Sequence, residues 1–182
     1  EENNVVYLTE AKIESKQQAN NITIKNYRID RKGSENIHHY LTTTEECILR
    51  GQAVIRGVNE LRDEGFIPNI VIFHGGMGLG LFLRDMLPNA ILIGYFEWWF
   101  DRINTKYLVK EYSFDDQLSA GIRNLTTLKE IELCTVGVVP TEWQKTQFPK
   151  LVLKKLRVIF DGIDTSFFRK NMNSITRNIL IR

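Results

Sequence analysis

"IVIFHGGMGLGLFLRDMLPNAILIGYFEWWF", residues 70–100, places a glycine-rich turn and a short amphipathic stretch between two apolar runs. The runs 70–73 and 90–94 are β-branched or aromatic and short, as buried strands are. Between them we expect a short helix from about Leu79 to Leu87, which Pro88 ends. Strand, helix and strand in this order predict a parallel sheet covered by helices.

The same alternation extends along the rest of the chain. Further strands are predicted at 5–8, 22–28, 134–139 and 156–160, the second of them poor and edge-like. Thr43 and Glu46 have the spacing of a capping box and open a predicted helix. Ser113 and Thr141 are expected to cap two more helices. The first helix carries Ile48, Ile55, Val58 and Leu61 on one side, and the second carries Leu118, Ile122, Leu125 and Leu128 on one apolar face.

These elements predict an α/β domain with a Rossmann-like, doubly wound and mainly parallel sheet. The first strand of such a sheet is central and is followed by a glycine-rich turn and a helix. Here the strand at 5–8 is followed by another strand instead. We therefore expect that the native first strand lies before residue 1, and that its absence exposes an apolar edge that tends to pair or aggregate.

The composition suits one globular domain. The chain has 182 residues, 43% of them apolar, and a net charge of +2. Its basic residues are balanced by acidic ones and form no long run, which argues against a nucleic-acid partner. No signal peptide or spanning segment is apparent, so a cytoplasmic enzyme or binding domain fits. Cys47 and Cys134 lie in buried patterns and are interpreted as core thiols rather than a disulfide.

Candidate site residues follow the two strands of the opening stretch, because ligands bind beyond the carboxyl ends of parallel strands. His74 could bind a hydroxyl or shuttle a proton, and Glu97 sits among aromatic residues where a carboxylate is costly unless it is used. The turn glycines allow backbone N–H groups to meet an anion or a sugar oxygen. A tight turn without ligand, a core histidine and a surface carboxylate are the alternatives. The candidates for substrate binding are Gly75, Gly76, Gly78, Trp98 and Trp99, whose indoles could stack on a sugar ring.

A dinucleotide site is a second possibility. Gly76, Gly78 and Gly80, with Glu97 about 20 residues further on, imitate the dinucleotide fingerprint. The spacing departs from that fingerprint, which would need glycine at Leu81, and the turn is not the first of the sheet. The possibility of a dinucleotide-dependent enzyme stays open.

Four segments in order carry a resemblance to a known family: "LRGQAV" at 49–54, residues 64–100, "TEWQKTQFP" at 141–149 and "LRVIFDGIDTSFF" at 156–168. They resemble the amino-terminal domain of bacterial family-four glycosyltransferases of the GT-B fold. Asp161 and Gly162 match the junction that leads toward the second domain of such enzymes. The resemblance implies an acceptor-side domain at 1–168, the start of an interdomain linker at 169–182, and a carboxyl-terminal nucleotide-sugar domain that is absent here.

The resemblance also implies a reaction. Such enzymes move a hexose from a nucleotide diphosphate sugar to an acceptor hydroxyl, here with retention, and this chain alone is expected to bind no cofactor or metal and to be inactive. His74 and Glu97 would be the catalytic residues, and Asp161 and Gly162 would join the substrate-binding set. Many family members place a histidine where this chain has Glu97, so its role is left open. A non-catalytic module of the same fold is the remaining alternative.

The implied partners are the carboxyl-terminal domain of the same chain and a sugar or lipid-linked acceptor. Basic residues gather near Trp143 and Phe148 and could hold an anionic surface, although a solvated helix face is the commoner meaning of such a cluster. The basic residues are Lys145, Lys150, Lys154, Lys155 and Arg157. This cluster predicts peripheral contact with the inner membrane face from the cytoplasm.

Overall fold

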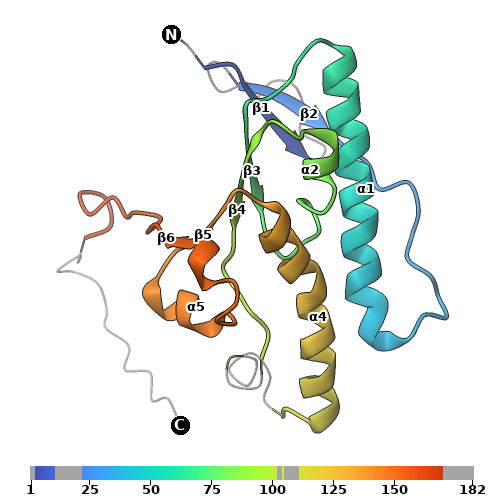
Figure 1. Cartoon of the computed structure of the whole chain (residues 1–182), viewed down its shortest axis with the longest axis vertical. Helices are drawn as coiled ribbons and strands as arrows, with labels where there is room; N and C mark the ends of the chain where they lie inside the picture. Colours follow the sequence, from blue (N-terminus) through green and yellow to red (C-terminus); the bar gives the residue numbers. More distant parts are fainter. Residues whose placement is uncertain (1–2, 11–21, 102–103, 105–110, 170–182) are drawn as a thin grey trace.

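The computed structural model describes residues 3–10, 22–101, 104 and 111–169. Its strands form two parallel sheets (Figure 1). The larger sheet has the order β3 (Ile70–His74), β4 (Ile91–Tyr95), β5 (Val136–Val139) and β6 (Leu156–Val158), and β1 (Val5–Thr9) pairs with β2 (Ile22–Asn26). All neighbouring strands run parallel. The predicted α/β class with a parallel sheet is confirmed.

Two long helices, α1 (Thr42–Asp63) and α4 (Phe114–Leu133), pack against each other beside the strands (Figure 1). Shorter elements complete the layer: α2 (Leu83–Met86), α5 (Glu142–Gln147) and the 3₁₀ turns η1 (His39–Leu41) and η2 (Leu153–Lys155). Helix α1 contacts both the small sheet and the glycine turn. A Cβ on Gly57 would lie 3.1 Å from Leu8 of β1, and one on Gly51 would lie 2.7 Å from the Gly78 carbonyl.

The core is built around Phe96, which directly follows β4 and is 1% exposed. Its ring meets those of Phe73 and Phe148 edge to face, with centroids 6.3 Å and 6.5 Å away. A Cβ on Gly94 would lie 2.5 Å from this ring, and one on Gly137 would lie 3.2 Å from it. The glycine of β4 is therefore explained by the space that Phe96 needs, whereas a Cβ on Gly137 of β5 would first meet Leu156, at 2.5 Å.

Helix α4 has an unexpected orientation. An amphipathic helix normally turns its apolar face to the core, yet Leu118 and Leu125 are 46% and 51% exposed. The face that packs inward is small and largely polar. Half of the apolar face expected from the sequence is therefore exposed, whereas Ile122 and Leu128 are half-buried and Leu128 packs against the core. The buried residues are Ala120, Asn124, Thr126, Thr127, Glu130 and Ile131.

The predicted helix ends were partly right. Ser113 and Asp116 form a capping box at α4, and the Thr141 side chain accepts a hydrogen bond from the Gln144 N–H at α5, as expected. The capping box at Thr43 is wrong, because η1 winds directly into α1 and the helix begins at Thr42 without a side-chain cap. The helix expected from Leu79 is also shorter, since the glycine turns extend to the start of α2.

Strand β3 lies at the end of the larger sheet. Among the described strands it pairs with β4 alone, and Ile70 and Ile72 are 55% and 72% exposed. The apolar edge expected from the sequence is present, whereas the strand that would cover it stays a prediction. The predicted linker lies almost wholly outside the described residues. Cys47 and Cys134 are buried free thiols, as expected.

Candidate functional site

The centre of the candidate site is an imidazole–carboxylate pair. His74 is the last residue of β3, and Glu97 follows β4 by two residues. His74 lies opposite Tyr95 in the parallel register, which brings the segment after β4 alongside it. His74 Nε2 is 3.0 Å from Glu97 Oε2, and the two side chains are 43% and 49% exposed. The structure thus joins the two residues that the sequence placed at neighbouring strand ends.

Tyr95 links this pair to a third strand end, and sequence reasoning missed it. Its hydroxyl donates to Asp161 Oδ1 at 2.7 Å and contacts Glu97 Oε1 at 3.4 Å. Partial burial, followed by the hydrogen bond and charge of Asp161, raises the pKa of Tyr95, so the phenol stays a neutral donor. Asp161 follows β6, whereas the adjacent Gly162 is exposed, has a φ of +80° and contacts none of these side chains.

The aromatic residues after Glu97 face different environments. Trp99 packs on Phe148, with ring centroids 5.5 Å apart, and belongs to the rim of the core. Trp98 is half-buried beside Trp143, and its indole N–H is buried without a hydrogen-bond partner among the described residues. Gln144 of α5 donates to the Glu97 carbonyl at 3.1 Å and fixes the backbone of this segment. Of the two predicted stacking residues, Trp99 packs against the core, whereas Trp98 is not among the residues packed against it.

The turn glycines serve close packing. A Cβ on Gly75 would lie 2.2 Å from the Phe96 ring, and one on Gly78 would lie 2.1 Å from the Cys47 carbonyl oxygen of α1. Gly76 and Gly78 also have φ near +86° and +85°, a conformation that L side chains rarely adopt. These residues are therefore required by the turn itself, with or without a ligand.

A buried carboxylate occupies the inner side of this turn. Glu130 of α4 is 0% exposed and accepts hydrogen bonds from the Gly76 N–H at 2.6 Å and the Gly80 N–H at 2.8 Å. Burial raises the pKa of Glu130 to about 7, against the lowering effect of these amides and of His74. The turn amides do meet an anion, as anticipated, but the protein supplies it. A dinucleotide pyrophosphate would need those amides, so this arrangement argues against a dinucleotide site.

Sequence reasoning missed Glu130, although a signal for it exists. Asn124, Thr127 and Glu130 recur every three residues, so they lie near one another on one helix face. Polar residues in that pattern ordinarily indicate a solvated face, and only their closeness to the turn makes them internal.

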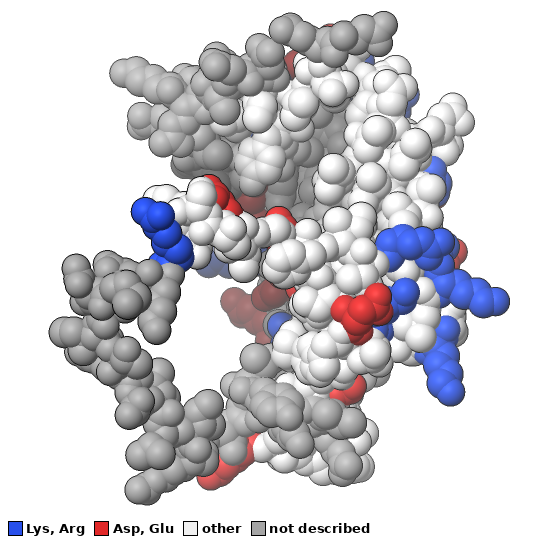
Figure 2. Space-filling model, turned by 90° about the vertical axis from the view of Figure 1, so that its left-hand side faces the viewer, with Lys and Arg blue, Asp and Glu red and all other residues white. Residues whose placement is uncertain are grey.

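Basic and apolar side chains share a different part of the surface. Figure 2 looks onto the side that holds β6 and α5 in Figure 1 and shows Lys and Arg side chains gathered toward one edge. Of the basic residues predicted to act together, Lys155 is committed elsewhere, because its Nζ donates to the carbonyls of Ile131, Glu132 and Cys134 and closes the end of α4. Of the two aromatic residues, Trp143 is 52% exposed whereas Phe148 is buried.

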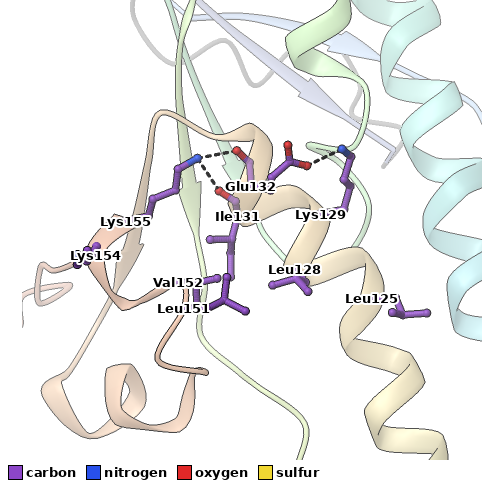
Figure 3. A pocket seen from close by; sticks show the side chains of 9 residues that line it. All are labelled: Leu125, Leu128, Lys129, Ile131, Glu132, Leu151, Val152, Lys154 and Lys155. Atoms are coloured by element: carbon purple, nitrogen blue, oxygen red, sulfur yellow. Dashed lines mark hydrogen bonds and ion pairs between the residues drawn. The ribbon is translucent and has the colours of Figure 1, made fainter.

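A cavity of about 540 Å³ lies beside this basic surface (Figure 3). It opens between the carboxyl-terminal half of α4 and the segment at η2, and leucine, isoleucine and valine side chains line it together with lysines and a glutamate. The ion pair of Lys129 with Glu132 lies at its margin (Figure 3). The lining residues are Leu125, Leu128, Lys129, Ile131, Glu132, Leu151, Val152, Lys154 and Lys155.

In the part of the chain that the structure describes, no helix is long and apolar enough to cross a bilayer. The same residues contain no cluster of three His, Cys, Asp or Glu side chains that could ligate a metal. The adjacent His38 and His39 stack on each other, with ring centroids 4.7 Å apart.

The parallel α/β fold, with polar side chains beyond three strand ends, defines a Rossmann-like domain. The sequence matches the family described as Glycosyl transferase family 4 group over residues 1–168. The chain belongs to this family, and its general activity is glycosyl transfer. No curated protein matches the chain.

Proposed function

We propose that this chain is the acceptor-side domain of a GT-B glycosyltransferase that moves a hexose from a nucleotide diphosphate sugar to an acceptor hydroxyl with retention. The observation that carries the proposal is the half-exposed His74–Glu97 pair beyond neighbouring strand ends. Neither side chain contributes to the core, and both are open to a ligand. The nucleotide sugar would bind to a second, carboxyl-terminal domain, reached through residues 169–182.

In this proposal the acceptor hydroxyl lies against His74 and Glu97. The hydroxyl oxygen bonds to the anomeric carbon of the hexose, the bond from that carbon to the diphosphate breaks, and the hydroxyl proton passes to the pair or to the departing phosphate. Tyr95 fixes Glu97 and Asp161 relative to each other through its hydroxyl. Trp98 offers an indole for contact with the acceptor ring, and Gly162 lets the chain turn away after Asp161.

The test compares the 182-residue chain with a longer protein that contains it and the second domain. Each would be incubated with labelled nucleotide diphosphate sugars and a panel of acceptors. We expect transfer by the longer protein and none by the 182-residue chain, because the diphosphate contacts lie in the second domain. Turnover by the shorter chain would refute this division of labour. Absence of transfer by the longer protein would favour a non-catalytic module.

We further propose that the enzyme touches an anionic membrane surface from the cytoplasm and meets a lipid-linked acceptor there. The outward apolar face of α4, the cavity beside it and the nearby basic residues support this. Leu151 at the cavity is 76% exposed. Apolar groups next to cations suit an interface where acyl chains lie under anionic head groups.

Vesicle binding tests this surface. A basic residue near an anionic membrane contributes about 1 kcal/mol, so Lys154→Glu should weaken binding to phosphatidylglycerol vesicles by about fivefold or more. Lys32→Glu is the matched control, because Lys32 is also exposed and lies in a loop whose Ser34 bonds to Glu45 of α1 rather than to α4 or η2. Sedimentation with the vesicles measures both variants. Equal binding of the wild type to acidic and neutral vesicles would contradict the membrane proposal and would mean that this surface is an ordinary solvated one.

A further inference from the structure

A single peptide group connects the buried Glu130 with His74. The N–H of Gly76 donates to Glu130 Oε2 at 2.6 Å, and the carbonyl of Gly75 lies 3.1 Å from His74 Nδ1. These two groups belong to the same peptide unit, which is trans, so they point in opposite directions. A carboxylate that holds the N–H on the inner side therefore also aims the carbonyl at the imidazole on the outer side.

The direction of that carbonyl decides which nitrogen of His74 carries hydrogen. A carbonyl oxygen can only accept, so a hydrogen bond at this contact requires Nδ1–H. In the neutral ring Nε2 then has the free lone pair, and this nitrogen faces Glu97 Oε2 at 3.0 Å. Glu97 opposes this form, because its carboxylate can only accept and draws the ring hydrogen toward Nε2, so Glu97 and the Gly75 carbonyl compete for it. In the Nδ1–H form, Nε2 is the nitrogen that can take a proton from an acceptor hydroxyl.

We infer that Glu130 is a positioning residue that sets the tautomer of His74 by holding the Gly75–Gly76 peptide. The inference depends on the proposed function only for the role of Nε2 as the nitrogen that takes the acceptor proton. The assignment of the tautomer itself stands on the contacts.

The surroundings make Glu130 the group that fixes this peptide. Its second oxygen accepts from the Gly80 N–H at 2.8 Å, so one rigid side chain of α4 holds both ends of the turn. The N–H of Gly75 is bound separately, to the Tyr95 carbonyl at 2.7 Å, which orients the preceding peptide. Thr127 of α4 lies next to Gly76, since its Oγ1 would be 3.4 Å from a Cβ there. The Gly75–Gly76 peptide is the one in this turn that contacts His74 and Glu130 together.

The two side chains also influence each other electrostatically. The charge of His74 is among the causes that lower the pKa of Glu130, behind the Gly80 and Gly76 amides and opposed by burial. Removing Glu130 therefore takes away both the peptide orientation and a negative charge near the imidazole.

Long-range ¹H–¹⁵N NMR of the 182-residue chain labelled at histidine tests the inference without any assay of activity. The chain has three histidines, and His74→Ala assigns the signals of the third. At a pH where the ring is neutral, we expect wild-type His74 to be in the Nδ1–H form. Nε2–H as the main form in the wild type would overturn the inference, whatever the variants do.

Variants at Glu130 give the second arm. In Glu130→Ala, His74 should lose its preference for Nδ1–H, because the hydrogen bond that holds the Gly75–Gly76 peptide in place is released. Glu130→Gln keeps one acceptor oxygen and should restore part of the preference. Glu132→Gln is the control, since Glu132 is an exposed neighbour on the same helix, paired with Lys129. An unchanged His74 spectrum in a folded Glu130→Ala protein would contradict the assignment. If Glu130→Ala does not fold, the inference is tested by the tautomer of His74 in Glu130→Gln and in the wild type.

Discussion

Replacing His74 by alanine, or Glu97 by glutamine, in the full-length enzyme is expected to lower kcat for sugar transfer on the order of 10²-fold or more. This expectation follows from the proposed function, in which the pair moves or orients the hydroxyl proton in the transition state. Both side chains are roughly half-exposed, so their loss should leave the melting temperature nearly unchanged. Transfer kinetics and thermal melting of the same preparations measure the two effects.

The chain offers a matched control for this experiment. His39 Nε2 lies 3.2 Å from Asp115 Oδ2, and both side chains are well exposed. It is the same chemical pair as His74 with Glu97, but it joins η1 to the first turn of α4 and neither residue follows a strand. His39→Ala should keep full activity. If the His74 and Glu97 variants instead melt lower while their folded fraction transfers normally, both residues are structural and the proposed site is misplaced.

The meeting of His74 with Glu97 could be predicted because it needs only two consecutive strands in parallel. Strand ends in such a sheet lie at one edge, and the register places His74 opposite Tyr95. Apolar runs bounded by glycine and proline mark both strands plainly. Location therefore followed from local pattern, whereas the proton-handling role stays a prediction.

The contact of Tyr95 with Asp161 could not be predicted in the same way. These residues are 66 positions apart in the chain. Their contact depends on β5 and β6 being added beside β4 in that order, which no local pattern fixes. From sequence alone, a tyrosine at the end of a strand cannot be distinguished from an ordinary core or surface residue.

The orientation of α4 escaped prediction because close packing overrode its apolar pattern. The helix lies against the glycine turn, where Thr127 is next to Gly76 and Glu130 binds the turn amides. The turn also exposes N–H groups on its inner side, and a buried N–H needs an acceptor. Glu130 supplies one, so a polar face packs inward and Leu118 and Leu125 remain outside.

The free energy of unfolding is expected to fall as the pH rises from about 4.5 to about 7, with Glu130 as the cause. Burial raises the pKa of Glu130 to about 7 in the folded chain, against an ordinary value of 4.5. Between these values the folded state holds a proton that the unfolded state has released, so unfolding releases a proton and becomes easier as the pH rises. A difference of 7 − 4.5 = 2.5 pKa units corresponds to about 3 kcal/mol.

Urea unfolding of the wild type and of Glu130→Gln, from pH 4.5 to pH 8, isolates this contribution because glutamine does not titrate. The unfolding free energy of the variant minus that of the wild type should increase by about 3 kcal/mol across the range, nearly all of it below about pH 7. Glu132→Gln is the control of opposite sign, since Lys129 lowers the pKa of Glu132, so its loss should cost a little stability above the ordinary titration range and show no rise toward pH 7. A flat difference for Glu130→Gln would mean that the amides of Gly76 and Gly80 already offset the burial of the charge. Glu130 would then be ionised throughout and hold the turn equally at every pH in the range.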